Sequence, residues 1–194
     1  EVQAIEKGDR QVRTLSSTPR SRKHDSDAVV ISLEDNEALY LYDGDRVRVV
    51  FGPKTVFLEP NERPKVLFIS AGVPLKPNGL RIAKLSLGPD FIRDQVSIRT
   101  RDNATLNLEV SYRWRFHVYP ERPDKLFALK DFVGFVAQTL SAEIRAEAAR
   151  HDFERFHAEA AQLITGALFG EVKEREFAEN GLVIFGIDVE SITP

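Results

Sequence analysis

The chain has 194 residues, 42% hydrophobic and 29% charged, which is typical of an ordinary globular protein and excludes disorder throughout. The formal net charge of -3 provides no global positive field for nucleic acid or anionic lipid, and no apolar run approaches the roughly 18 residues of a membrane-spanning helix. Cysteine is absent, which excludes disulfides, thiol catalysis and thiolate metal sites and is consistent with the cytoplasm, where we expect the protein.

Residues 1–27 are expected to hold the end of a preceding module and a linker. Glu1–Ile5 is a short possible strand, and the serines and Pro19 that follow are typical of a connecting segment. The basic cluster at residues 20–24 can contact phosphate, but a solvated linker is the commoner explanation. Methionine is absent from the whole chain. Because translation begins with methionine, we expect the chain to be a piece of a longer protein.

Short apolar stretches separated by turn signals follow from residue 28. The expected strands are Ala28–Leu33, Ala38–Tyr42, Arg46–Phe51, Thr55–Leu58, Val66–Ser70 and Arg81–Leu87. Asp43 and Gly44 are a strong hairpin signal, because we expect both to be central turn residues with positive φ. Residues 28–90 are therefore predicted to form a small antiparallel β-repeat.

The clearest pattern is a hairpin from Val96 to His117, in which apolar and polar residues alternate. Its second strand places six apolar side chains on one face: Leu106, Leu108, Val110, Tyr112, Trp114 and Phe116. The residues between them are mostly polar or charged. One face of this strand should therefore lie in a core, and the other should meet water or a partner.

The period then changes to about 3.6 residues, which indicates helices. The first should follow the N-cap Asp131 and bury Phe132, Val136, Leu140 and Ile144. The second should begin near Asp152 and end at Gly170, with Phe153, Phe156, Ala160, Leu163 and Ala167 on one stripe.

The last expected strand, Leu182–Ile192, follows a turn at Asn180 and Gly181. We expect Val183, Phe185, Ile187 and Val189 on one of its faces, and Leu182 and Ile184 on the other. Apolar residues on both faces are typical of a central strand. The predicted fold class is α+β: the β-repeat, then in residues 91–194 a mixed sheet covered by two amphipathic helices.

No residue pattern indicates catalysis. The histidines, His24, His117, His151 and His157, lack metal-ligand spacing. The chain has no phosphate-binding loop, dinucleotide glycine motif or nucleophile elbow. We therefore predict no catalytic residue, no cofactor and no metal site, and favour a structural or binding role over an enzyme.

The polar face of the hairpin is the best candidate for a contact surface. Readers of single-stranded RNA interleave aromatic side chains with their cations, whereas the hairpin's aromatic residues should point to the opposite face. A sheet face that meets solvent or a neighbouring copy is therefore favoured over an RNA platform. The candidate lateral-contact residues are Arg113, Arg115 and His117 of this face, together with the helix residues Arg145 and Arg150.

Eight short segments, in colinear order, resemble the major vault protein family. They are Arg48–Pro53, Ser70–Gly72, Leu87–Phe91, Asp131–Gly134, Phe156–His157, Leu168–Gly170, Asn180–Val183 and Asp188–Ser191. The order of hairpin, two helices and final strand is also similar to the band 7 domain of stomatins, prohibitins and flotillins. The stretch between Gly170 and Phe177 is shorter than in animal members. This indicates a distant homologue, and a microbial source is one of the sources it allows.

The resemblance implies that residues 28–90 are the last wall repeat of a barrel-shaped particle and that residues 91–194 are a shoulder domain with a band 7-like (SPFH-like) fold. The implied function is a non-catalytic segment of a self-assembling ribonucleoprotein shell. Its partners would be copies of itself side by side, with RNA or proteins enclosed. A membrane-associated scaffold of the band 7 class is the alternative, and an enzyme with an unrecognised carboxylate pair is a third hypothesis.

Overall fold

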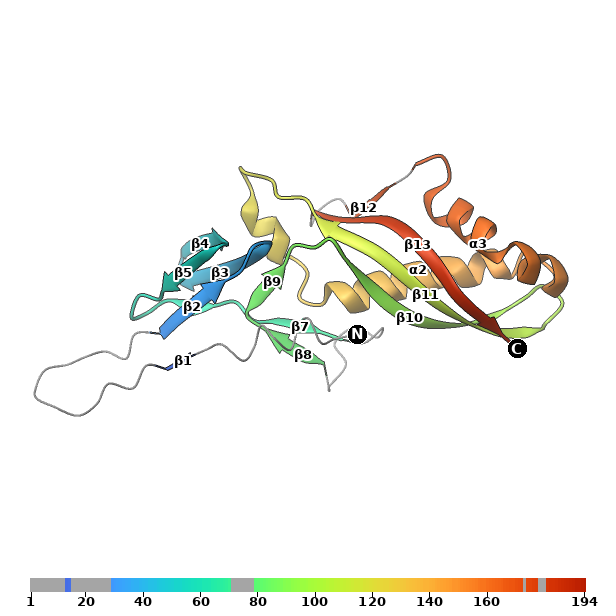
Figure 1. Cartoon of the computed structure of the whole chain (residues 1–194), viewed down its shortest axis with the longest axis horizontal. Helices are drawn as coiled ribbons and strands as arrows, with labels where there is room; N and C mark the ends of the chain where they lie inside the picture. Colours follow the sequence, from blue (N-terminus) through green and yellow to red (C-terminus); the bar gives the residue numbers. More distant parts are fainter. Residues whose placement is uncertain (1–12, 15–28, 71–78, 173, 178–180) are drawn as a thin grey trace, which may run out of the picture. The chain divides into compact units, whose positions relative to one another are not determined.

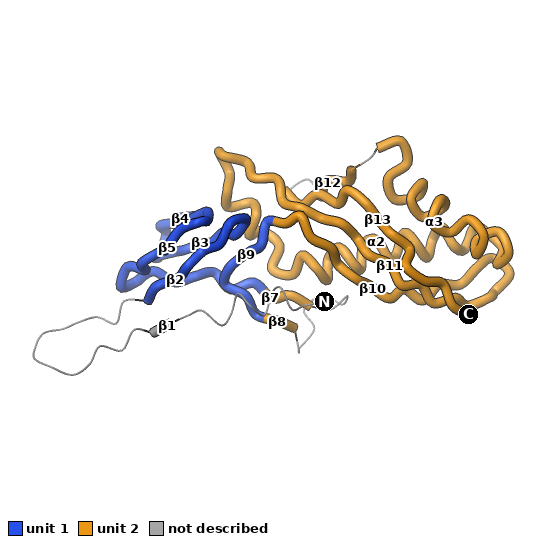
Figure 2. The backbone as a smooth tube through the Cα atoms, in the orientation of Figure 1, with its two compact units in different colours: residues 1–67, 81–87 blue, residues 68–80, 88–194 orange. Residues whose placement is uncertain are grey.

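A computed structural model describes residues 13–14, 29–70, 79–172, 174–177 and 181–194 (Figure 1). These residues form antiparallel sheets and two α-helices, which confirms the predicted α+β class. The chain divides into unit 1, residues 1–67 with 81–87, and unit 2, residues 68–80 with 88–194 (Figure 2). The expected strand Glu1–Ile5 and the basic cluster at residues 20–24 lie outside the described residues.

Unit 1 consists of short antiparallel strands. They are β1 (Arg13–Thr14), β2 (Val29–Leu33), β3 (Glu37–Asp43), β4 (Arg46–Phe51), β5 (Lys54–Phe57), β6 (Arg63–Pro64) and β9 (Lys84–Ser86). Strand β2 lies between β1 and β5 in one sheet, and β3 pairs with β4, β6 and β9 in another. Alternate residues of these strands form one apolar cluster: Ile31, Leu33, Leu39, Leu41, Val50 and Val56.

Two expectations for these strands need correction. The β3–β4 turn is centred on Gly44 and Asp45, and only Gly44, with φ 56°, has a positive φ. The expected strand Arg81–Leu87 is two strands, β8 (Leu80–Ile82), which pairs with β7 (Leu67–Ile69), and β9. The break lies at Ala83, because the two strands on either side of it pair in different sheets, β8 with β7 and β9 with β3.

Unit 2 has a four-stranded sheet in the order β10-β11-β13-β12 among the described residues. Its strands are β10 (Asp90–Arg99), β11 (Thr105–Phe116), β13 (Leu182–Thr193) and β12 (Arg175–Phe177). As predicted, β13 is a central strand. All pairs are antiparallel, so the expected mixed sheet is wrong.

The helices of unit 2 explain the direction of β13. After β11 come a 3-10 helix, Pro123–Phe127, then α2 (Phe132–Ala148) and α3 (Phe153–Phe169). Helix α2 runs back along the sheet and α3 reverses the chain again (Figure 1). Because two helices separate the strands, β13 returns antiparallel to β11, whereas a crossover through one helix gives a parallel strand.

The core of unit 2 lies between the sheet and α2. The ten residues expected in the core are all buried: Leu106, Leu108, Val110, Tyr112, Trp114, Phe116, Phe132, Val136, Leu140 and Ile144. The ring of Phe132 packs edge-on against Trp114 and Phe116, at centroid distances of 5.0 and 5.3 Å. These contacts show that the even-numbered residues of β11 face the helix. As predicted, Asp131 caps α2 by accepting from the N–H of Gly134.

The buried stripe of α3 differs from the expected one. It contains Phe156, Ala160, Ile164 and Leu168, whereas Leu163 is only half-buried and Ala167 is exposed. The observed stripe advances by four residues each time, whereas the expected stripe alternates steps of three and four. Because a turn contains 3.6 residues, the two stripes separate around the helix.

A bulge changes the faces of β13. Trp114 pairs with Ile184 and Arg113 pairs with Gly186, so Phe185 is an extra residue. Ile184 and Ile187 consequently lie opposite Trp114 and Tyr112, and the expected grouping of Ile187 with Val183 and Phe185 is wrong.

Candidate functional site

The open face of the unit 2 sheet is the face turned away from α2. It carries the odd-numbered residues of β10 and β11, because their even-numbered neighbours pair on the side that contacts Phe132. Along β11, Asn107, Glu109, Arg113 and Arg115 are exposed on this face, and Ser111 is buried. The open face is therefore polar and charged.

Ion pairs cross the open face between strands of the sheet, and one of them spans β11. Arg93 of β10 lies 3.5 Å from Glu190 of β13. Arg113 of β11 lies 3.3 Å from Asp188 of β13.

Ser111 stands opposite both Arg93 and Asp188 in the register, so the charged chains around it account for its burial. Arg115 also has a carboxylate partner, Glu174, at 2.5 Å. The face thus presents both signs of charge with little net charge.

Two aromatic rings lie among these charges. Phe185 lies beneath the guanidinium groups of Arg113 and Arg115, at 5.9 and 5.4 Å from the ring centroid. Phe91 is 45% exposed and lies 5.4 Å from the guanidinium of Arg93. The hairpin's own aromatic residues, Tyr112, Trp114 and Phe116, are buried on the opposite face as expected, and the rings on the open face come from other segments, Phe185 being the extra residue of the β13 bulge. Cation–π contacts of this kind hold arginine side chains flat against a sheet.

The five predicted contact residues do not form one surface. Arg113 and Arg115 lie on the open face, and His117 follows at the end of β11, where its ring packs edge-on against Tyr119 at 4.7 Å. Arg145 and Arg150 belong to α2 or its end, on the other side of the sheet. Arg145 donates through Nε to the Ser97 carbonyl oxygen over 3.1 Å.

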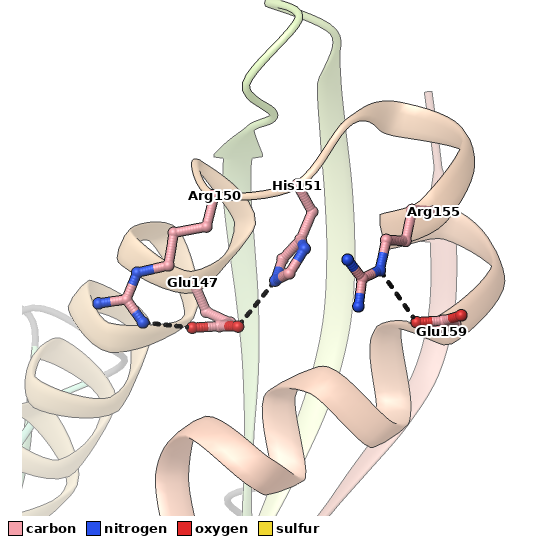
Figure 3. Close-up of polar contacts among 5 residues, drawn as sticks. All are labelled: Glu147, Arg150, His151, Arg155 and Glu159. Carbon is pink, nitrogen blue, oxygen red and sulfur yellow. Dashed lines mark hydrogen bonds and ion pairs between the residues drawn. The ribbon is translucent and has the colours of Figure 1, made fainter.

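Arg150 belongs to a polar cluster at the corner between α2 and α3 (Figure 3). Glu147 accepts from Arg150 Nη1 over 2.9 Å and lies 2.8 Å from His151 Nε2. Arg155 and Glu159 form a separate ion pair on α3, at 3.3 Å (Figure 3). His151 therefore secures a helix end, and no group of three metal-ligating side chains occurs in the part of the chain that the structure describes.

Sequence reasoning missed the partners of the predicted arginines. Asp188 joins Arg113, and the Arg93–Glu190 pair lies on the same face, only through the registers of β10 and β13 against β11. The alternation of β10 was a usable signal for Arg93. On β13, Asp188 lies beyond the bulge at Phe185, and Glu190 lies at a second register shift; the sequence reveals neither irregularity.

One carboxyl group has an unusual environment on the helix side of the sheet. Burial raises the pKa of Asp94, while the backbone N–H of Gln95 and the positive charge of Arg145 act in the opposite direction. Burial also raises the pKa of the nearby Tyr112 hydroxyl. Both shifts have burial as their main cause, and a shift of that origin is as common in a core as in an active site.

Comparison with known families accounts for almost all of the chain. A family model described as "Shoulder domain" matches residues 88–194, which is more than half of the chain. A second, described as "Major Vault Protein Repeat domain", matches residues 28–87. No helix in the described ranges is long and apolar enough to cross a membrane.

The curated relatives that match the chain include major vault proteins from several organisms. Major vault protein beta of Dictyostelium discoideum is 38% identical, in a match that covers 90% of this chain and 21% of the relative. Major vault protein of Trypanosoma cruzi (strain CL Brener) is 36% identical, in a match that covers 98% of this chain and 23% of the relative. Major vault protein of Homo sapiens is 36% identical, in a match that covers 92% of this chain and 22% of the relative. The chain thus spans about a fifth of the length of these relatives.

Proposed function

The chain belongs to the major vault protein family, and from this premise we propose that it is a non-catalytic structural segment of a self-assembling ribonucleoprotein particle shell in the cytoplasm. Its partners are copies of itself standing side by side, and the shell encloses RNA or proteins. Supporting this proposal, the charged side chains of the open face are joined in ion pairs instead of converging on a cavity.

The proposed division of the chain is a wall repeat in residues 28–90 and a shoulder domain in residues 91–194. The two family models meet between residues 87 and 88, which supports a boundary in this region. Residues 1–27 are assigned to the end of the preceding repeat and a linker.

Side-by-side contact in a ring joins two different surfaces of each copy, because a head-to-tail contact must present one surface to each neighbour. We assign the open face, with Arg113, Arg115 and His117, to one neighbour. The helix-covered side, with Arg145 and Arg150, faces the other. The mixed charge of the open face supports this assignment. Arg113 and Arg115 each lie beside a carboxylate, so the face offers both signs of charge to complementary charges of a neighbour.

The experiment is a charge reversal, Arg113→Glu with Arg115→Glu, in the full-length protein. Negative-stain microscopy should show fewer closed particles than for the unmodified protein, while circular dichroism should show an unchanged fold, because both side chains are about half exposed. Normal particles from the variant would remove the open face from the lateral contact. Dispersed monomers from the unmodified protein at high concentration would overturn the shell itself.

A swap of charges provides the matched control. Arg113→Asp with Asp188→Arg keeps an ion pair within the chain but exchanges the positions of the two charges. If the face contacts a neighbour, the swap should weaken assembly nearly as much as the double reversal. If these residues stabilise only their own sheet, the swap should assemble normally.

The element order of hairpin, two helices and final strand supports a band 7-like (SPFH-like) fold for residues 91–194. A membrane-associated scaffold is therefore the second candidate function. Flotation of the chain with liposomes that contain anionic lipid tests it: recovery in the lipid fraction would favour a membrane scaffold, and absence from that fraction would count against it.

A further inference from the structure

Strand β10 lies at the end of the unit 2 sheet, and among the described residues no strand pairs with its outer side. An edge strand of ten residues presents a row of backbone N–H and C=O groups that another chain can pair with. Proteins that are held at high local concentration need some means of blocking such an edge.

Alternate residues of β10 direct their backbone groups outward. In an antiparallel pair, every second residue exchanges hydrogen bonds with its partner and the residues between point both groups away. Phe91, Gln95 and Ser97 belong to one alternating set. The backbone groups of these three residues form hydrogen bonds with side chains. This identifies their set as the outward one.

Three side chains occupy outward groups of this edge. The Phe91 N–H donates to Asp90 Oδ1 over 2.7 Å. The Gln95 N–H donates to Asp94 Oδ1 over 2.9 Å. The Ser97 carbonyl oxygen accepts from Arg145 Nε of α2 over 3.1 Å.

Arg145 is itself held in place. Its Nη1 donates to Ser141 Oγ, one turn earlier on α2, over 3.3 Å. The guanidinium also attracts the Asp94 carboxylate. Arg145 is therefore held at the edge of the sheet by a contact within its own helix.

We propose that Asp90, Asp94 and Arg145 guard the β10 edge against pairing with the β10 edge of a second copy of this chain. Pairing along the full edge would need the N–H groups of Phe91 and Gln95 and the carbonyl of Ser97 together with the other outward groups, and these three already have partners. The inference does not depend on the proposed shell, because it concerns the edge of the sheet and not its open face. It predicts that neighbouring copies meet through side chains, without continuing the sheet.

The test is the 194-residue chain with Asp90→Ala, Asp94→Ala and Arg145→Ala. A matched control carries Glu154→Ala, Arg155→Ala and Glu159→Ala, which makes the same change in net charge on an exposed part of α3. Sedimentation velocity should show association of the triple variant increased by about tenfold or more, as expected when hydrogen bonds that compete with pairing are removed. The control should match the unmodified chain.

A proline separates edge pairing from other causes of association. Ser97→Pro removes an outward N–H and is compatible with an edge strand, so adding it to the triple variant should restore the original oligomeric state. Association that persists with the proline would overturn the proposal, as would a folded triple variant that does not associate. If the triple variant unfolds, Arg145→Ala replaces it: the single variant should associate, and adding Ser97→Pro should reverse that association. A purely lateral-contact role for Arg145 would weaken association, which is the opposite result.

Discussion

Asp102, in the turn between β10 and β11, accepts a hydrogen bond over 3.1 Å from the backbone N–H of Phe153, the first residue of α3. Asp152, at the N-cap position of α3, makes no such bond with its own helix. It pairs instead with Arg101, in the same turn as Asp102. The hairpin turn therefore caps the helix from a distance, and the helix end holds the hairpin turn.

The Asp102 cap should make stability depend on pH in a defined direction. The Thr100 hydroxyl hydrogen bond holds the pKa of Asp102 below its ordinary value of 3.8. A carboxylate with a lowered pKa contributes stability above its unfolded value and loses it as the pH falls through the folded value. Asp102→Ala should therefore be less stable than the unmodified chain in urea at pH 7, with a difference that shrinks below pH 3.8. A difference that does not change with pH would contradict this.

Two glycines should respond to alanine in opposite directions. Gly181 has φ +67°, and an added Cβ would lie 2.5 Å from the His117 carbonyl oxygen, so Gly181→Ala should destabilise by at least about 1–2 kcal/mol. An added Cβ at Gly166, on an exposed part of α3, meets nothing within 4 Å, so Gly166→Ala should stabilise by about 0.5–1 kcal/mol. Thermal unfolding of both variants measures the contrast. Equal effects would show that backbone conformation is not what distinguishes the two sites.

Leu140 is fully buried on α2. Leu140→Ala should lower the free energy of unfolding by about 2–5 kcal/mol, the sum of lost transfer energy and a cavity. Val172, which is 64% exposed, is the control, and Val172→Ala should change stability by less than about 0.5 kcal/mol. Guanidinium unfolding monitored by Trp114 fluorescence gives both values. A loss below 1 kcal/mol at Leu140, in the range of a surface site, would indicate that the core collapses around the cavity.

Asp131 holds Ser70 to the start of α2. Its buried carboxylate accepts from the Ser70 N–H and the Gly134 N–H, each over 3.0 Å, and from the Ser70 hydroxyl. Asp131→Ala leaves these donors unpaired and should destabilise by about 2–4 kcal/mol. Asp131→Asn keeps one acceptor oxygen, and Ser70→Ala removes only the hydroxyl, so each should cost less. Urea unfolding should show the largest loss of stability for Asp131→Ala. An equal loss for Asp131→Asn and Asp131→Ala would exclude the shared acceptor as the cause.

Asp94 should be a site where removing a charge stabilises the protein. Because burial raises its pKa, folding disfavours the ionised form, so stability is lost as the pH rises from the ordinary value of 3.8 through the folded pKa. Asp94→Asn keeps an oxygen that accepts from the Gln95 N–H and has no charge to desolvate. Its melting temperature at pH 7 should exceed that of the unmodified chain, and the gain should vanish in acid. A lower melting temperature at pH 7 would show that attraction to Arg145 outweighs burial.

The sequence was sufficient for the elements whose pattern depends on a single buried face. The alternation of β11 and the helical period of α2 placed Trp114 and Phe132 in one core, because burial of a face requires that period. Asp131 was identifiable as an N-cap because its side chain acts on a residue three positions away. These are local consequences of the chain.

The rest depends on partners that are distant in the sequence. The bulge at Phe185 appears only when β13 is aligned with β11, and it decides which side chains share the open face. The antiparallel direction of β13 follows from the path of two helices. The cap from Asp102 to Phe153 joins residues 51 positions apart. The candidate contact surface was consequently predicted as a row of arginines, without the carboxylates that neutralise it.

The antiparallel sheet also determines how unit 2 would respond to being pulled. Strand β10 begins beside Trp114 at one end of β11, and β13 finishes beside Asn107 at the other. Tension applied at Asp90 and Thr193 would load the hydrogen bonds on both sides of β11 in shear, because these bonds run across the strands. Within each ladder the bonds would resist together, without opening one at a time from an end. In mechanical terms, β11 is the tie that carries tension through the unit.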